Sequence, residues 1–159
     1  MEANVKFSLF SKIITIVVFG LLVGIGVYCA IMGDSTGIIV LIICLILLIP
    51  SLYYSPKSIK VNDTTITINT YLSKHKLLIS NIENIDYYLP MMVNFRICAS
   101  GGLMGYWGIF RGIDIGNYMA YYGKSSECFL IRMKNGDKYV LGCENPDAMM
   151  KYIENKLNN

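Results

Sequence analysis

Hydrophobic residues are distributed unevenly along this chain, with two long apolar runs first and a mostly alternating pattern afterwards. The first run, 13–32, contains no charged residue. At about 1.5 Å per residue, a helix of this length spans ~30 Å, the thickness of a bilayer's hydrocarbon core. A short break at 33–37 separates it from the second run, 38–54, so the two helices should lie antiparallel. The pattern therefore predicts a transmembrane helical hairpin over 13–54.

Two alternatives to a membrane hairpin are a cleaved signal peptide and a buried hairpin of a soluble protein. A signal peptide has an apolar region of about 7–15 residues and a small-residue cleavage site. The first run is longer, and a second run follows it. A soluble protein would have to enclose two helices that are apolar on every face, and the remaining chain is too short for that. A membrane hairpin is the favoured interpretation.

Charged residues around the hairpin predict its orientation. Lysines stand on both outer flanks, whereas the connecting loop carries only Asp34. Cationic flanks favour the cytoplasmic side of a membrane. We therefore expect a cytoplasmic tail over 1–12, both termini in the cytoplasm, and 34–36 on the far side. The reverse orientation would place all four flanking lysines outside: Lys6, Lys12, Lys57 and Lys60.

Gly20 and Gly24 form a Gly-x-x-x-Gly pair in the first run and are the candidate helix-packing residues. Glycines four apart share a helix face and allow another backbone to approach closely. That face could serve a homodimer, but the tethered second helix makes packing within the chain the favoured interpretation. Nothing else in the sequence supports a homo-oligomer. Neither run contains an acidic residue, a basic residue or a histidine, so no proton relay or ion path is visible.

From residue 57 onward the sequence predicts one small domain made mostly of strands. Residues 58–61 and 64–70 alternate around Asn62-Asp63, which indicates a tight hairpin. We expect 73–76 to form a polar corner before strands at 77–79 and 82–89. A second hairpin should join 127–134 and 137–143 through Asn135-Gly136, a pair that accepts positive φ. The expected buried rows of the first hairpin are Ile59, Val61, Ile66 and Ile68.

The last predicted element is a helix over about 146–157. Asn145 is a suitable N-cap, Pro146 fits the first helical position, and Asp147 complements the helix dipole. An apolar stripe that includes Met149 and Ile153 recurs at helical spacing. This helix is expected to pack on the sheet.

The segment 100–126 is rich in glycine and aromatic residues. It lacks the glycine-rich motifs that cradle phosphate groups. The favoured interpretation is a structured surface loop pinned by its own aromatic side chains. The alternative is an aromatic platform for a partner or for the membrane interface. The candidate interaction residues are Tyr106, Trp107, Phe110 and Arg111.

The remaining chemistry argues against catalysis. No cysteine pair has Cys-x-x-Cys spacing, and a cytoplasmic domain should keep its thiols reduced. Since His75 is the only histidine, a zinc site or a histidine-based triad is not expected, and His75 itself should be a solvated corner residue. We predict no catalytic residues, cofactor or metal. A net charge of +3 without an arginine-rich stripe also argues against nucleic acid as a partner.

Several motifs together resemble bacterial pleckstrin-homology-like (PH-like) domains. They are Ser80-Asn81-Ile82-Glu83-Asn84-Ile85, the Gly-Tyr-Trp-Gly-x-Phe segment at 105–110, Tyr118-Met119-Ala120-Tyr121, and the terminal helix. The resemblance covers roughly 57–157. It implies a mainly-β PH-like barrel of about seven antiparallel strands in two roughly orthogonal sheets, with a C-terminal α-helix plugging one end. The domain would occupy 57–159, and the family supplies no catalytic residues.

The resemblance also bears on partners. Eukaryotic relatives that bind phosphoinositides carry basic residues around the first hairpin loop, whereas Asn62-Asp63 has no cation. Inherited phosphoinositide binding is therefore not expected. The leading hypothesis is a membrane-anchored cytoplasmic interaction or scaffolding domain, multi-pass in the bacterial inner membrane, that binds a protein partner or the membrane surface. The alternative is an accessory or sensor subunit of a transport or signalling complex that acts through its transmembrane hairpin.

Overall fold

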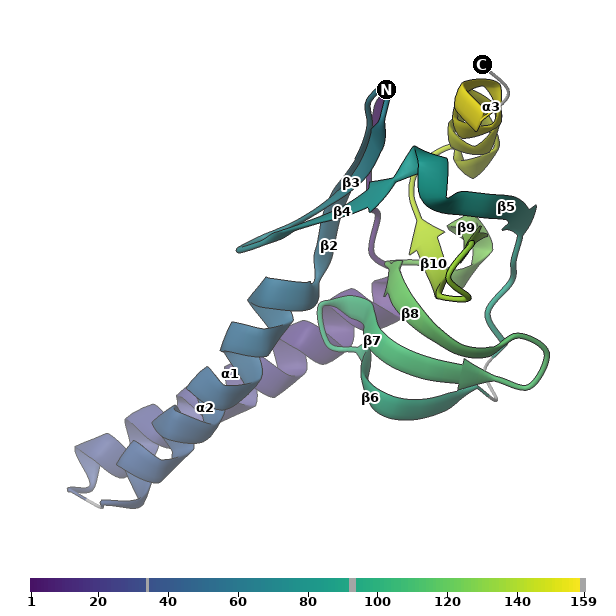
Figure 1. The fold of residues 1–159 in the computed structure, drawn as a ribbon. Helices are drawn as coiled ribbons and strands as arrows, with labels where there is room; N and C mark the ends of the chain where they lie inside the picture. The colour runs from purple at the N-terminus through teal and green to yellow at the C-terminus, as the bar shows by residue number, and fades with distance from the viewer. Residues whose placement is uncertain (34, 92–93, 158–159) are drawn as a thin grey trace.

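The computed structural model describes residues 1–33, 35–91 and 94–157. A helical hairpin projects from a β-rich domain that carries both the N-terminal strand and the C-terminal helix (Figure 1). In chain order the helices and strands are β1 (Glu2–Asn4), α1 (Leu9–Ile31), α2 (Thr36–Tyr54), β2 (Pro56–Val61), β3 (Thr65–Thr70), β4 (Lys74–Leu78), β5 (Ile82–Tyr87), β6 (Phe95–Gly102), β7 (Gly105–Gly112), β8 (Gly116–Tyr122), β9 (Cys128–Met133), β10 (Lys138–Gly142) and α3 (Pro146–Leu157). Short 3₁₀ turns lie at Ile79–Asn81 and Ser125–Glu127.

Helices α1 and α2 are both long and apolar enough to cross a bilayer. Most of their apolar surface is exposed, so they are not the core of the β-rich domain. Helix α1 begins at Leu9, four residues before the predicted run. The earlier start has a local cause, since Ser8 caps the helix by accepting a hydrogen bond from the Ser11 amide at 3.1 Å.

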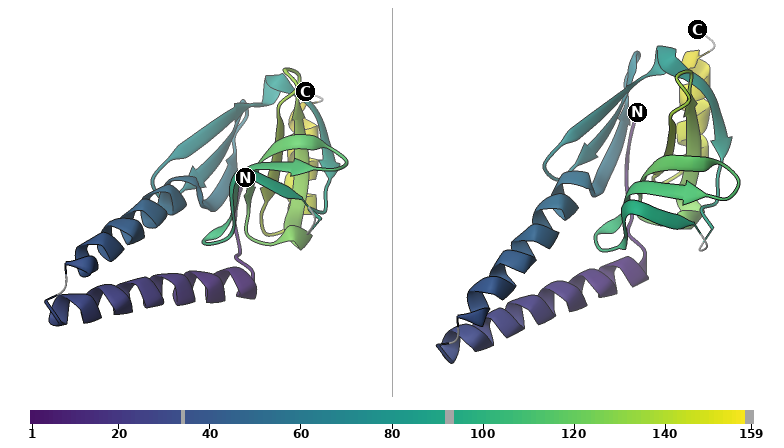
Figure 2. Two further views of the ribbon diagram at one scale, coloured as in Figure 1. Left: turned by 90° about the horizontal axis from the view of Figure 1, so that it is seen from below. Right: turned by 60° about the horizontal axis from the view of Figure 1, so that its bottom comes forward.

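The two helices approach most closely at their tip and lie farther apart at the domain (Figure 2). Close approach at the tip needs Gly26 and Gly37, because a Cβ atom on Gly37 would lie 3.2 Å from the Gly26 carbonyl oxygen. Gly20 and Gly24 have open space where a Cβ would project, so they do not contact α2. The tight contact predicted for the Gly-x-x-x-Gly pair is made instead by other glycines. Asp34, expected in the loop, lies outside the described residues.

Strands β1–β4 form the first sheet, sheet A, in the order β1-β2-β3-β4. The hairpin expected across Asn62-Asp63 is present, with Val61 opposite Ile66. Two features differ from the sequence-based expectation. The N-terminal tail contains a strand, β1, which pairs antiparallel with β2. The polar corner is displaced to Tyr71–Ser73, and Lys74 already begins β4.

The other six strands form sheet B, in the order β5-β9-β10-β8-β7-β6. All neighbours are antiparallel except β10 and β8. The glycine- and aromatic-rich segment is therefore not a surface loop, because most of it forms the end of β6 and strands β7 and β8. The expectation failed because glycine weakens every strand signal, whereas here glycines permit close backbone approach. At Gly108, where φ is +103°, a Cβ would clash with the Cys98 carbonyl oxygen across the ladder.

The main core lies between the two sheets and is closed at one end by α3. All four residues expected in the buried rows of the first hairpin are at most 1% exposed. Met149 and Ile153 of α3 are fully buried in the same cluster. The predicted class is confirmed: two apolar helices, a mainly-β domain and a C-terminal helix. The described residues form ten strands, one of them N-terminal to the hairpin, which exceeds the expected number because 100–122 adds strands instead of a loop.

Candidate functional site

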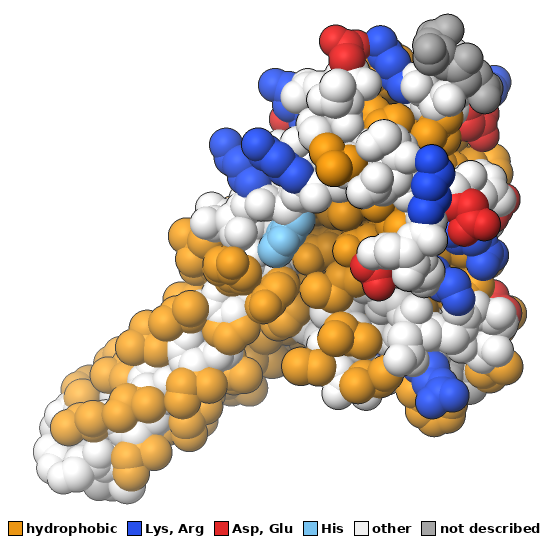
Figure 3. Space-filling model, viewed as in Figure 1, with side chains coloured by type: hydrophobic (Ala, Val, Ile, Leu, Met, Phe, Trp, Pro, Cys, Tyr) orange, Lys and Arg blue, Asp and Glu red, His pale blue; other side chains and the backbone are white. Residues whose placement is uncertain are grey.

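A cleft of about 770 Å³ opens over the core between sheet A and sheet B. Sheet A ends at its edge strand β4, and the part of sheet B beyond this edge, near the end of α2, is not covered. Figure 3 shows this hollow, floored by hydrophobic side chains, between the two lobes above the hairpin. Its walls come from α2, β4, β7, β8, β10 and the β9–β10 turn: Tyr54, Lys74, His75, Lys76, Leu77, Ile109, Asn117, Tyr118, Met119, Tyr121, Gly136, Asp137, Lys138 and Tyr139.

Strand β4 forms one wall of the cleft and is also the edge strand of sheet A. Because side chains alternate along a strand, His75 and Leu77 point inward while Lys74 and Lys76 are exposed. Neither lysine forms an ion pair with any residue in the described part of the chain. The β4 wall is therefore apolar inside and positively charged along its rim.

Sheet B forms the opposite wall with side chains from β7, β8 and β10. Ile109 lies opposite Met119, and Met119 lies beside Tyr139 in the parallel pair. Tyr121, on the same face, is 2% exposed, whereas Ile109 is 41% exposed. The apolar surface therefore runs from the closed core outward into solvent, a gradient that suits the entry of an apolar group.

An aromatic cluster closes the cleft on the hairpin side. The ring of Tyr54, at the end of α2, stacks on Trp107 with centroids 5.7 Å apart. His75 lies parallel to Tyr54 at 6.2 Å and tilted against Tyr121 at 5.4 Å. The hairpin thus supplies part of the cleft, and the cleft is complete only with the helices in place.

His75 is not the solvated corner residue that the sequence suggested. It lies in β4 among tyrosines, and its buried Nε2 has no hydrogen-bond partner among the described residues. Burial lowers the pKa of this imidazole below its ordinary value, because the charged form loses hydration. The expectation was wrong because it took the neighbouring lysines as a sign of exposure. Alternation along the strand places those lysines on the opposite face from His75.

The four candidate interaction residues do not form one patch. Trp107 and Arg111 point to the cleft face of sheet B, and Arg111 is exposed. Tyr106 and Phe110 point to the other face, where they stack on Tyr122 and Tyr118 at 4.8 and 5.8 Å. The alternation of a strand, which the loop interpretation left out, separates residues that are adjacent in sequence.

A second structural feature joins the hairpin to the domain. The β6–β7 turn, Gly102–Gly105, contacts both helices, and we call this contact the joint. The buried Ser11 hydroxyl of α1 donates to the Gly102 carbonyl at 2.6 Å and accepts from the Gly105 amide at 2.7 Å. Met104 adopts φ of +51°, an unusual conformation for a residue with a side chain.

Both helices stabilise this strained residue of the joint. The Met104 amide donates to the Thr15 hydroxyl of α1 at 2.8 Å. The Met104 carbonyl accepts from the Ser55 hydroxyl, directly after α2, at 2.6 Å. The hydroxyls thus bind groups that a hairpin turn would otherwise leave buried without partners. The Trp107 indole adds a bond to the Leu103 carbonyl at 3.0 Å.

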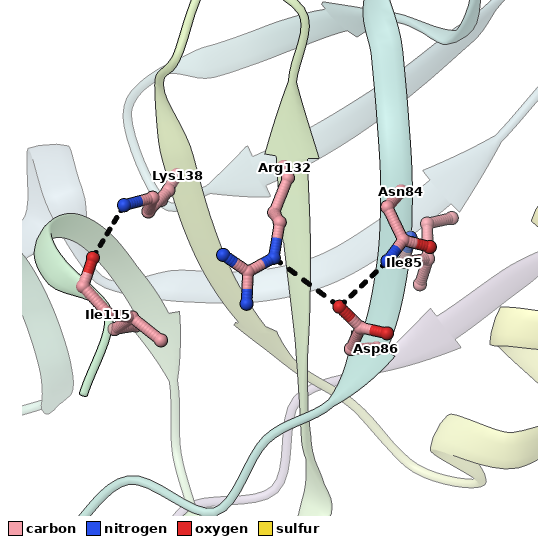
Figure 4. Close-up of polar contacts among 6 residues, drawn as sticks. All are labelled: Asn84, Ile85, Asp86, Ile115, Arg132 and Lys138. Atoms are coloured by element: carbon pink, nitrogen blue, oxygen red, sulfur yellow. Dashed lines mark hydrogen bonds and ion pairs between the residues drawn. The ribbon is translucent and has the colours of Figure 1, made fainter.

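Two other cations near the cleft, Lys138 and Arg132, are already engaged. Lys138 donates to the Ile115 carbonyl at 2.6 Å, and Arg132 on the neighbouring strand contacts Asp86 at 3.4 Å (Figure 4). Asp86 also accepts from Asn84 at 2.9 Å. Within the described residues no group of three or more potential metal ligands is present. All five cysteines are free in this structure. The chemistry that remains available at the cleft is apolar burial, cationic charge and backbone hydrogen bonding.

Sequence reasoning found Trp107 but missed the rest of this site. Tyr54 was not singled out as a candidate site residue, and His75 was expected to be exposed. The signal that could have found His75 is the alternation of residues 74–78, which places His75 and Leu77 on one face. The contact of these side chains with β8 and β10 depends on long-range strand pairing, which no local pattern specifies.

Comparisons with known proteins agree with this architecture. Residues 57–157 match a family model described as a bacterial PH domain. The match covers the strands from β2 onward and α3, and it excludes β1 and the hairpin. Neither the comparison with curated proteins nor that with solved structures found a match.

Proposed function

This chain belongs to the bacterial PH domain family, and on that premise we propose that it is a membrane-anchored, non-catalytic interaction domain. The hairpin crosses the bacterial inner membrane twice, and the domain lies in the cytoplasm. The cleft between the sheets is the surface that receives a partner. Orientation rests on the lysines that flank the hairpin, since cations favour the cytoplasmic side.

The observation that carries this proposal is the cleft itself. It combines an apolar interior, an exposed cationic rim and an unpaired strand edge within one opening of about 770 Å³. Apolar openings of this size with a few polar groups are typical of ligand sites. Because Tyr54 belongs to α2, the cleft is held next to the membrane surface.

In-cell photocrosslinking tests the role of the cleft. A photoreactive residue in place of Met119, inside the cleft, should give an adduct with another protein in intact membranes. The same residue in place of Ile113, which is 73% exposed and outside the cleft, is the control. Equal crosslinking at both positions, or none at Met119, would contradict the proposal.

Cysteine labelling tests the topology separately. In a variant without native cysteines, Ser35→Cys at the hairpin tip should react with an impermeant thiol reagent from outside the cell. Lys151→Cys on the exposed face of α3 should react only after the membrane is opened. The reverse pattern would place the domain outside the cytoplasm.

A second candidate function, a sensor or accessory subunit that acts through the hairpin, is supported by the joint. Thr15 of α1 and Ser55, directly after α2, both hydrogen-bond to Met104, so a relative movement of the two helices should either move the β6–β7 turn or break these bonds. The turn is continuous with Trp107, which lies against Tyr54 in the wall of the cleft. A partner bound to the helices could therefore alter the cleft.

Co-purification in mild detergent separates the two candidates. Partner binding through the cleft should be lost in a variant that fills it, such as Ile109→Trp. Partner binding through the hairpin should survive that change but be lost when apolar residues on the Gly20 and Gly24 face are replaced. The second result would favour the sensor function over the interaction domain.

A further inference from the structure

Within the described part of the chain, one edge of β4 has no strand beside it, and residues 74–77 of this strand border the cleft. Among the described strands of sheet A, β4 pairs with β3 alone, and the opposite edge strand of the sheet is β1. Sheet A therefore already accepts one added strand, from the N-terminal segment of its own chain. At the β1 edge the Asn4 carbonyl already accepts from the Glu144 amide at 2.9 Å, whereas the β4 edge faces the cleft.

The register of β4 identifies which backbone groups are available. Thr70 donates to the Ser73 carbonyl at 3.0 Å, and Ile79 donates to the Thr64 carbonyl at 2.9 Å. In an antiparallel pair, hydrogen-bonded and non-hydrogen-bonded positions alternate. With Ile68 opposite His75 and Ile66 opposite Leu77, the N–H and C=O groups of β3 bond to His75 and Leu77. Those of Lys74, Lys76 and Leu78 therefore point to the free edge.

The side chains around this edge specify the chemistry of an added strand. One face of such a strand would lie over Ile109 and Met119 in the cleft, and the other would lie beside Lys74 and Lys76. Directly opposed side chains on neighbouring strands interact, and opposite charges are favourable there. Asp137 on the far wall disfavours acidic residues inside the cleft. Acidic residues are thus favoured only on the lysine side.

We propose that the β4 edge binds an extended acidic segment of a partner protein, in which apolar residues alternate with Asp or Glu, as an added strand across the cleft. This proposal rests on the interaction function argued above and names its ligand. Five residues of β4 match a segment of about 17 Å. A second copy of this chain is a poor occupant, because pairing two β4 edges would place lysine opposite lysine.

A peptide selection on the full chain tests this assignment. The protein in phosphatidylcholine nanodiscs is offered a display library of random ten-residue peptides. We expect enrichment of sequences in which apolar and acidic residues alternate. Enriched peptides without this alternation, or no enrichment over empty nanodiscs, would overturn the proposal.

Matched variants then locate the binding. Lys74→Glu/Lys76→Glu should weaken the enriched peptide about tenfold or more, because two favourable pairs become repulsive. Lys60→Glu/Lys151→Glu changes the net charge equally on exposed positions away from the cleft and should leave the affinity within about twofold. On binding, the amides of Lys74 and Lys76 should exchange more slowly with solvent. Equal loss in both variants, or unchanged exchange in β4, would refute edge binding.

A lipid arm distinguishes a membrane occupant. An environment-sensitive dye on Met119→Cys should respond to the enriched peptide and not to phosphatidylglycerol in the nanodiscs. A response to phosphatidylglycerol without peptide would assign the cleft to anionic lipid instead. The failures are separable: absent crosslinking at Met119 in cells contradicts the interaction function, whereas crosslinking without dependence on Lys74 and Lys76 contradicts only the added strand.

Discussion

The joint and the cleft lie on either side of Trp107 and differ in how completely their polar groups are paired. At the joint, Ser11, Thr15 and Ser55 bond to the backbone groups of the β6–β7 turn, and Ser11 and Ser55 are at most 1% exposed. At the cleft, the β4 edge has no strand beside it, and His75 Nε2 lacks a partner among the described residues. Trp107 belongs to both, with its indole nitrogen at the joint and its ring against Tyr54.

This difference separates positions that stabilise the molecule from positions left available for binding. Removing one partner from a buried, fully paired group costs the desolvation of the other. Where groups are exposed or unpaired, little is lost by substitution and binding energy remains to be gained. The joint should therefore be sensitive to mutation, and the cleft tolerant of it unless a partner is present.

Gly105→Ala should have the largest effect on the joint. The alanine Cβ would lie 2.7 Å from the Phe7 ring at φ of +92°, so strain and overlap add. We expect a loss of about 4 kcal/mol in the free energy of unfolding, measured by circular dichroism in micelles. Gly116→Ala is the control, since φ is +73° there but the space is open, and it should cost only ~1 kcal/mol. Equal costs would show that the joint is loosely packed.

Ser11→Ala should rank second because it leaves the Gly102 carbonyl and the Gly105 amide without their partner. At roughly 1–3 kcal/mol for each unsatisfied group, we expect a loss of about 3 kcal/mol. Ile109→Ala in the cleft should cost under ~1 kcal/mol, since that side chain is 41% exposed. Thermal denaturation of the two variants compares the regions directly, and a larger loss for Ile109→Ala would reverse the comparison.

The coupling between Trp107 and Tyr54 should be smaller. A double-mutant cycle with Trp107→Leu and Tyr54→Leu is expected to give an interaction energy of about 1 kcal/mol, typical of stacked rings. Trp107→Leu combined with Tyr87→Leu serves as the control, because Tyr87 is 64% exposed and outside the cleft. An interaction energy near zero for the first pair would mean that the domain and hairpin are independent at the cleft.

Elements that depend on neighbours in sequence could be predicted from the sequence, whereas features that depend on long-range packing could not. Local patterns were sufficient for the two apolar helices, the first hairpin, the Asn135-Gly136 hairpin and α3, because each depends on neighbours in sequence. Strands β7 and β8 were missed, since their glycines are explained only by backbones packed against them, as at Gly108. Gly20 and Gly24 matched a packing motif, yet the geometry of the tip uses Gly26 and Gly37.

The candidate site was predicted less completely than the fold. Trp107 was singled out from the aromatic composition of its segment, but its partner Tyr54, and His75 on which Tyr54 stacks in turn, come from elements far away in sequence. Phe110 belongs to the core on the other face of sheet B and is 3% exposed. Both outcomes depend on strand alternation and sheet order, which a local pattern cannot supply for a segment interpreted as a loop.

The smallest expected effect is the pH dependence that His75 contributes. Burial lowers its pKa in the folded state below the ordinary value of 6.5. Between that lowered value and about 6.5, the unfolded chain binds more protons than the folded one, so stability rises with pH through this window. The contribution of the neutral imidazole is complete above pH 6.5 and is lost as the pH falls toward the folded-state pKa.

His75→Phe keeps an aromatic ring between Tyr54 and Tyr121 and removes the titration. The difference in thermal midpoint between the two proteins should therefore shift in favour of the variant as the pH is lowered from 8 to 5. A difference that does not vary with pH would show that water reaches the imidazole freely, and the cleft would then be more open than its aromatic walls indicate.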